Sequence, residues 1–106
     1  MEHRVAITIS GHGRDAQNGD ALLGAFHDVH PEADAVVDQN IETGNMTATF
    51  IVDAEGATDA VERGAAIFAE ALIQATLPLT QVVDVHASLA SPHAESSERE
   101  LEPAGA

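Results

Sequence analysis

The segment from Val36 to Asp53 constrains the fold more than any other part of this sequence. Each half alternates apolar and polar residues with a period of two, which is typical of β-strands with one buried face. Thr43-Gly44-Asn45 separates the halves, and glycine and asparagine tolerate the positive φ angles of a tight hairpin turn. We therefore expect strands over Val36–Glu42 and Met46–Asp53, joined by a two-residue turn at Gly44-Asn45.

This turn implies a definite register. With Thr43 opposite Met46, Ile41 lies opposite Ala48 and Gln39 opposite Phe50. One face of the hairpin is then mostly apolar and the other mostly polar. Because a shift of one residue would exchange the two faces, the register and the buried face are predicted together.

The flanking segments have hydrophobic patterns that are alternately typical of strands and of helices. His3–Ser10 alternates like a strand, and Asp15–His30 has apolar residues three and four apart, with Asp15 as N-cap and Pro31 after its end. A second helix is expected from Thr58 or Asp59 to Thr76, and a last strand over Thr80–Leu89. The apolar stripe of the second helix consists of Val61, Ala65, Phe68, Leu72 and Ala75, broadened by Ile67 and Ala71.

The order β-α-β-β-α-β over residues 1–90 predicts one α+β domain of the ferredoxin-like, split β-α-β type. Right-handed crossovers place both helices on one face of a four-stranded antiparallel sheet with strand order 4-1-3-2. The other face is open. Its expected residues are Ala6, Thr8, Ser10, Thr47, Thr49 and Ile51 on the central strands, and Asp38, Asn40, Val82, Asp84, His86 and Ser88 on the edges.

Charge and composition narrow the functions. The formal net charge is -14, with 18 acidic residues, four arginines and no lysine. Such a field repels phosphate backbones, so we expect no nucleic-acid partner. The absence of lysine and the 20 alanines are typical of a GC-rich bacterial genome.

The sequence also suggests a compartment. It contains no cysteine, and no apolar run approaches the ~20 residues of a membrane span. Met1 leads directly into the first strand without a signal peptide pattern. We expect a cytoplasmic protein without a membrane partner. Residues 91–106 are rich in Glu, Ser and Pro, which predicts a disordered acidic tail.

A glycine-rich segment, Gly11-His12-Gly13-Arg14-Asp15, lies between the first strand and the first helix. It lacks the third glycine of a dinucleotide-binding loop and the Gly-Lys-Ser of a phosphate-binding loop, which favours a plain turn. Gly11 to Leu23, with Arg14, Asp15, Gly19 and Leu22, resembles the first loop of ACT regulatory domains, which share this topology and bind amino acids. The resemblance implies a ligand site near Gly11 to Gly19, although the compact Asp-Arg-Pro-Gly-Leu order is absent.

Six histidines raise the question of a metal site. His27 and His30 lie on one face of the first helix, whose end returns toward His3 in this topology. No third ligand is fixed by the sequence, so these three are weak candidates and the expectation is no metal. His86 and Asp84 on the open face are weak candidates for acid-base catalysis. With no tyrosine or tryptophan, an aromatic cofactor pocket is hard to build, and no cofactor is expected.

Three functional classes follow. The first is a non-enzymatic module that acts through homodimer formation at the open sheet face or by binding a protein partner. The second resembles the dimeric α+β barrel proteins, in which two such sheets enclose a small-molecule or cofactor-free catalytic cavity. The third is an ACT-like ligand sensor. Fold analogy alone does not decide among them.

Overall fold

The computed structural model describes residues 1–90, so the predicted tail lies outside the described residues. The elements are β1 (Glu2–Ile9), α1 (Ala16–Val29), the short 3-10 helix η1 (Pro31–Ala33), β2 (Val36–Asn40), β3 (Asn45–Asp53), α2 (Ala57–Ala75) and β4 (Val82–Leu89). Each predicted helix and strand is present, with ends that lie within two residues of the predicted ones.

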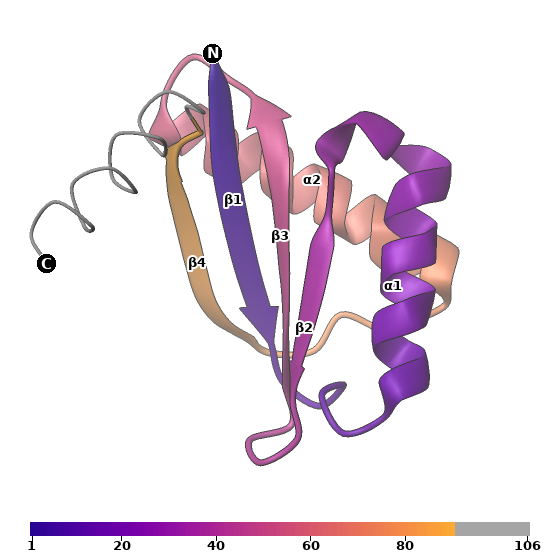
Figure 1. Ribbon diagram of the computed structural model, residues 1–106. Coiled ribbons are helices and arrows are strands. Elements are labelled where there is room, and N and C mark those ends of the chain that lie inside the picture. Colours follow the sequence, from indigo (N-terminus) through magenta and orange to yellow (C-terminus); the bar gives the residue numbers. More distant parts are fainter. Residues whose placement is uncertain (91–106) are drawn as a thin grey trace, which may run out of the picture.

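The four strands form one antiparallel sheet in the order β2-β3-β1-β4, which confirms the predicted fold. In Figure 1, α2 crosses behind the sheet and α1 lies beyond β2, on the side opposite to β4. The Asp15 carboxylate accepts a hydrogen bond from the Gln17 N–H and caps α1 as predicted. In residues 1–90, none of the helices combines the length and the apolar character needed to cross a membrane.

The predicted hairpin register is wrong. Val37 pairs with Ala48 rather than Val52, Gln39 with Met46 rather than Phe50, and Asn40 with Asn45. Four residues, 41–44, therefore connect the strands instead of two, and Ile41 lies in this loop with 73% of its surface exposed.

The side chain of Asn40 explains the longer loop. Its Oδ1 accepts hydrogen bonds from the N–H groups of Glu42 (3.0 Å) and Thr43 (3.1 Å), while the Gly44 N–H donates to the Asn40 carbonyl (2.8 Å). Gly44 has φ 76°, so the expected positive φ at this glycine is present. Each residue of β2 pairs with a residue of β3 four positions earlier than predicted. Because four is an even number, the side chains stay on their predicted faces of the sheet.

Three phenylalanines form the centre of the core between the sheet and the helices. The ring centroid of Phe26 lies 5.0 Å from that of Phe50 and 6.4 Å from that of Phe68. At Gly64, α2 approaches β1 so closely that an added Cβ would lie 2.9 Å from Cγ1 of Val5. The buried side chains come from β1, β3 and both helices; the largest are Phe26, Phe50, Ile9, Leu22, Met46, Leu72 and Val5.

The first half of α2 is rotated from its predicted orientation. Ala60 and Gly64 are buried, whereas Val61 is half-buried and Ala65 is exposed. The small buried residues let the helix lie near β1, which moves the larger Val61 away from the centre. The helix begins after Gly56, so neither Thr58 nor Asp59 is its N-cap.

The helix-side face of β4 is more exposed than predicted, because α2 covers it only in part, with Ala87 packed against the core. Val83, Val85 and Leu89 have exposed fractions of 52%, 39% and 61%. An irregularity between Thr8 and Ile9 pairs Val82 with Ile9, a residue of the covered face, so Val82 does not continue the open-face row of β4. The strand thus has apolar side chains on one face and polar ones on the other, and both faces reach solvent.

Candidate functional site

The open sheet face has a small, uncharged centre. Ala6 and Thr8 of β1 and Thr47 and Thr49 of β3 are all half-buried by their neighbours. The hydroxyls of Thr8 and Thr47 are hydrogen-bonded to each other at 2.7 Å. Each of these two polar groups therefore has a partner within the sheet, which lowers the free-energy penalty for covering the face.

Strand pairing defines two rows of side chains across this face, and the first row has a carboxylate at each end. Thr8 lies opposite Thr47 on one side and opposite Asp84 on the other, and Thr47 lies opposite Asp38. This gives the row Asp84–Thr8–Thr47–Asp38. The next row is His86–Ala6–Thr49–Val36. The neutral centre is thus bounded by carboxylates on β2 and β4, as the sequence predicted.

A broad hollow of about 630 Å³ lies on the open face near the β2–β3 loop. It is lined by Asp38, Gln39, Asn40, Ile41, Glu42, Asn45 and Thr47. Most of these side chains are polar, and two are carboxylates. The hollow continues the neutral centre toward one end of the sheet.

His86 and Asp84 lie two positions apart on β4, both exposed on the open face. Within residues 1–90, neither side chain has a hydrogen bond or ion pair with another residue. A general base needs a partner that fixes its orientation and proton position. The structure brings the two candidates to one surface but does not assemble a catalytic arrangement around them.

The glycine-rich loop is a structural connection. The Gly13 N–H donates to the Gly44 carbonyl (2.8 Å), and the side-chain amide of Gln39 donates to the carbonyls of His12 (3.0 Å) and Asp15 (2.6 Å). Its polar backbone groups therefore bind the hairpin rather than point toward a ligand. The histidine of this loop is buried, and its Nε2 donates to the carbonyl of Pro78 at 2.9 Å. Sequence reasoning missed this role, since nothing in a Gly-His-Gly segment indicates burial.

The three metal candidates have separate surroundings. His3 is buried and its Nδ1 donates to the Met1 carbonyl at 3.2 Å. The His30 ring lies between the carboxylates of Glu32 and Glu70, 3.3 Å from each, whereas His27 is exposed in the last turn of α1. Among residues 1–90, no group of three or more His, Asp or Glu side chains is arranged to hold a metal ion.

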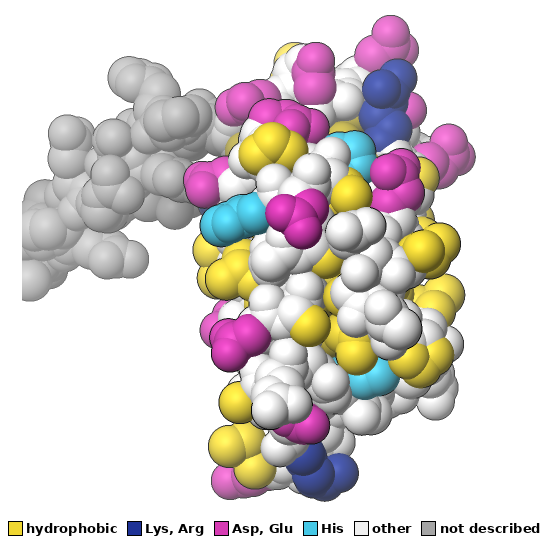
Figure 2. Space-filling model, turned by 90° about the vertical axis from the view of Figure 1, so that its right-hand side faces the viewer, with side chains coloured by type: hydrophobic (Ala, Val, Ile, Leu, Met, Phe, Trp, Pro, Cys, Tyr) yellow, Lys and Arg dark blue, Asp and Glu magenta, His cyan; other side chains and the backbone are white. Residues whose placement is uncertain are grey.

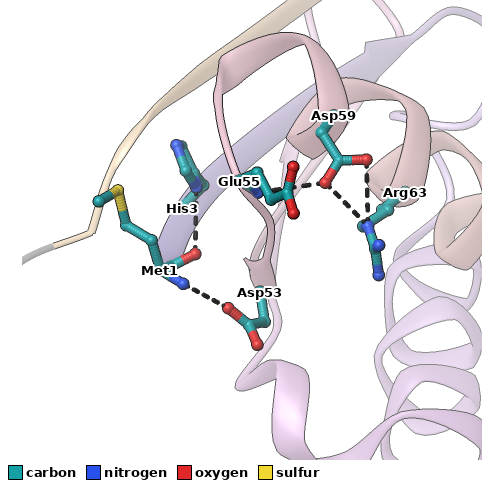
Figure 3. Close-up of polar contacts among 6 residues, drawn as sticks. All are labelled: Met1, His3, Asp53, Glu55, Asp59 and Arg63. Carbon is teal, nitrogen blue, oxygen red and sulfur yellow. Dashed lines mark hydrogen bonds and ion pairs between the residues drawn. The ribbon is translucent and has the colours of Figure 1, made fainter.

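A polar cluster at the start of α2 was not predicted (Figure 3). The Asp59 carboxylate accepts hydrogen bonds from the Glu55 N–H (3.1 Å) and from the Arg63 Nε (3.0 and 3.1 Å). The bond from the Glu55 backbone, followed by that from Arg63, holds the pKa of Asp59 below its usual range. The pKa of Asp53 is lowered in the same way by the amino group of Met1, 2.6 Å away. The Asp59 carboxylate thus binds the segment that leads into α2, and the Asp53 carboxylate joins the end of β3 to the amino terminus.

The remaining acidic charge is dispersed. On the face shown in Figure 2, acidic side chains are interspersed with apolar and neutral ones from end to end, and arginine side chains appear at its two extremities. The net charge of -14 is therefore not gathered into one acidic groove on this face.

Comparison with known proteins supports the fold. The structure resembles a protein from Chloroflexus aurantiacus described as a proposed antibiotic biosynthesis monooxygenase, with a TM-score of 0.50 and 12% sequence identity. The match covers 86% of this chain and 94% of that protein. At this identity the similarity concerns the fold. No family model and no curated protein matches the sequence.

Proposed function

We propose that this chain acts as a homodimer in which the open sheet faces of two copies enclose a cavity for a small uncharged molecule. The observation that carries the proposal is the centre of the open face. Its side chains, Ala6, Thr8, Thr47 and Thr49, are small, uncharged and half-buried, although charged residues stand at both edges. The chain carries 18 acidic residues, so a sheet face that contacts only solvent is expected to have charged side chains at its centre as well as at its edges.

The chemistry of this centre suits contact with a neutral ligand. Threonine offers a methyl group for apolar contact and a hydroxyl for hydrogen bonding. Ile51, half-buried on the same face opposite Arg4 of β1, adds apolar surface at one end, and the hollow near the β2–β3 loop adds polar groups at the other. The fold shared with the C. aurantiacus protein is compatible with this arrangement.

We propose binding rather than catalysis. The exposed His86 and Asp84 have no partner within residues 1–90 that would fix a proton on either group. A homodimer that acts only by contacting another protein is the second candidate, favoured by the exposed apolar residues of β4.

Light scattering and a neutral dye test the proposal. We expect the molar mass of two chains, and saturable binding of Nile red to that dimer. Thr49→Trp, which fills the centre of the open face, should abolish saturable binding, whereas Thr58→Trp at the exposed start of α2 should not. A monomer would refute the proposal. A dimer without saturable binding would refute the cavity and leave the second candidate.

A further inference from the structure

We propose that β4 joins the two copies by pairing antiparallel with β4 of the partner subunit, with Val85 opposite Val85 of the partner subunit. This inference rests on the proposed homodimer and names the surface that forms it. It concerns the edge of the sheet, and the proposed function concerns the face.

The first argument is that the outer edge of β4 has free backbone groups. The Ala90 N–H donates to the Glu2 carbonyl (2.9 Å), and the Ser10 N–H donates to the Gln81 carbonyl (3.0 Å). Along an antiparallel pair of strands, hydrogen-bonded and non-hydrogen-bonded residue pairs alternate. The even-numbered residues of β4 from Asp84 onward therefore direct their backbone N–H and C=O groups toward β1. Val85 and Ala87 consequently direct theirs outward. Figure 1 shows no described element beyond β4 on this side.

The second argument is the exposed apolar row. Val83 and Val85 are 52% and 39% exposed on the helix side of β4, beside the outward backbone groups. Edge strands of isolated domains are commonly protected by lysine, proline or a covering segment. Between Val82 and Leu89, β4 contains neither lysine nor proline. Asp84 is the acidic residue of this strand and lies on its other face, so the apolar row on the helix side is suited to another strand.

The third argument selects the register. If the two-fold axis is perpendicular to the sheet, two residues that pair across it must have their side chains on the same face. Because side chains alternate between the faces, the sequence numbers of the two paired residues differ by an even number. Centring the pair on Val85 places Asp84 opposite His86 of the partner subunit, twice by symmetry. Centring it on Asp84 would oppose two carboxylates, and centring it on His86 would oppose two imidazoles. A carboxylate can accept a hydrogen bond from an imidazole directly across a strand pair, whereas two carboxylates at that distance repel each other.

The same register matches the backbone. Val85 and Val85 of the partner subunit form a hydrogen-bonded pair, since both direct their backbone groups outward. Asp84 and His86 of the partner subunit then form a non-hydrogen-bonded pair, in which Cα atoms are only about 4.5 Å apart and side chains are closest. On the helix side, Val83 meets Ala87 of the partner subunit. Charge, apolar contact and backbone pairing therefore agree on one arrangement.

A second copy fits this edge better than residues 91–106 do. That segment contains four glutamates and two prolines, and Leu101 is its only large aliphatic residue. Proline lacks the N–H needed to extend a sheet. In the proposed pairing, both open faces lie on the same side of one continuous sheet, and closure of that sheet into a barrel would turn them toward each other. Asp84 and His86 then lie in the interface between the subunits.

Proline substitutions on neighbouring residues test the pairing. Val85→Pro removes an outward N–H, so we expect the monomer to fold, with an unchanged circular dichroism spectrum, while the measured mass falls to one chain. His86→Pro removes an inward N–H that faces β1 and should unfold β4. Val85→Lys should also give a folded monomer, because it places two ammonium groups together at the axis. Ile73→Lys, at an isoleucine of α2 that is 78% exposed, is the matched control and should remain a dimer.

Amide hydrogen exchange separates the possible outcomes. In the wild-type dimer, we expect exchange at Val85 and Ala87 to be slowed at least tenfold relative to the Val85→Lys monomer. A dimer with rapid exchange at these amides, or one that persists in both Val85 variants, would refute the pairing while leaving the proposed function intact. Slow exchange in a monomer, lost on deletion of residues 91–106, would assign the edge to that segment and refute the inference. A monomer with rapid exchange would refute both proposals.

Discussion

The two edge strands, β2 and β4, have similar alternating sequences but different surroundings. On β2, α1 packs over the helix-side residues, and Val37 and Gln39 are half-buried. On β4, Val83, Val85 and Leu89 of the equivalent row are exposed while Ala87 packs against the core, because α2 crosses behind the sheet toward α1 (Figure 1). The difference shows that alternation defines the faces of a strand, whereas the path of the helices decides which face is buried.

The β2 edge is also held at its end. The Arg14 guanidinium donates to the Glu42 carbonyl at 2.8 Å, and Gly13 and Gln39 join the glycine-rich loop to the hairpin. The corresponding end of β4 has the Ser10–Gln81 backbone bond and a bond from the Thr80 hydroxyl to the Ser10 carbonyl. We therefore expect substitutions in the helix-covered half and at the β2 end to affect folding, and substitutions on β4 to affect association.

The largest effect is expected for Phe68→Ala. Phe68 is 3% exposed and faces Phe26 across the helix interface, and truncation of a buried aromatic costs about 3–5 kcal/mol. Glu70→Ala, an exposed position 3.3 Å from the His30 ring, should change the free energy of unfolding by about 0.5 kcal/mol or less. Urea denaturation of both variants measures this difference. Equal losses would mean that α2 is oriented differently.

A smaller effect is expected for Gly13→Ala. The added Cβ would lie 2.2 Å from the Asn45 carbonyl oxygen and 2.6 Å from the Gly44 carbonyl carbon, so the backbone of the hairpin must move. We expect a loss of about 1–3 kcal/mol, typical of overpacking. Gly24→Ala on α1 is the control. Its Cβ would have no neighbour within 4 Å, so it should stabilise the protein by up to about 1 kcal/mol.

Hydrogen exchange can locate the damage in Gly13→Ala. Faster exchange should be confined to β2 and the start of β3, while β4 keeps the rate of the unsubstituted protein. If β4 responds as strongly as β2, the two edges are coupled and the contrast between them is wrong.

The smallest effect concerns pH. The pKa of Asp59 is lowered in the folded protein, so its stabilising contribution is present above the pKa of the unfolded carboxyl. That contribution is lost as the pH falls through the folded pKa. Asp59→Asn should therefore lower the thermal midpoint at neutral pH, and the difference from the wild type should disappear in acid. Asp20→Asn, at an exposed aspartate of α1, serves as the control. A pH-independent difference would contradict the role of the charge.

Much of the fold was predictable because hydrophobic period and chain order together select one topology. The β2–β3 register was not, since Gly44 and Asn45 were interpreted as a two-residue turn. Asn40, which bonds the N–H groups of Glu42 and Thr43, is the signal that could have corrected it, because asparagine is common at the first position of a type I turn. The residues predicted for the open face lie on it except Val82, where the irregularity beside Ile9 interrupts the alternation, but Arg4 and Val36 share that face and were not predicted.

The candidate site could be predicted only in part. Asp84 and His86 lie on the open face as expected, because the pleat fixes their direction. The burial of His12 against Pro78 and the cluster around Asp59 depend on contacts between segments far apart in the sequence or on local helix geometry. No periodic pattern encodes such contacts.

The close approach of α2 to β1 has a consequence for sequence evolution. Because a methyl group at position 64 would collide with Val5, the sizes of residues 5 and 64 are linked. Relatives of this protein should then show compensating change: an alanine at position 64 would accompany a smaller residue at position 5. Although the two positions lie 59 residues apart in the chain, we expect the residues at these positions to covary.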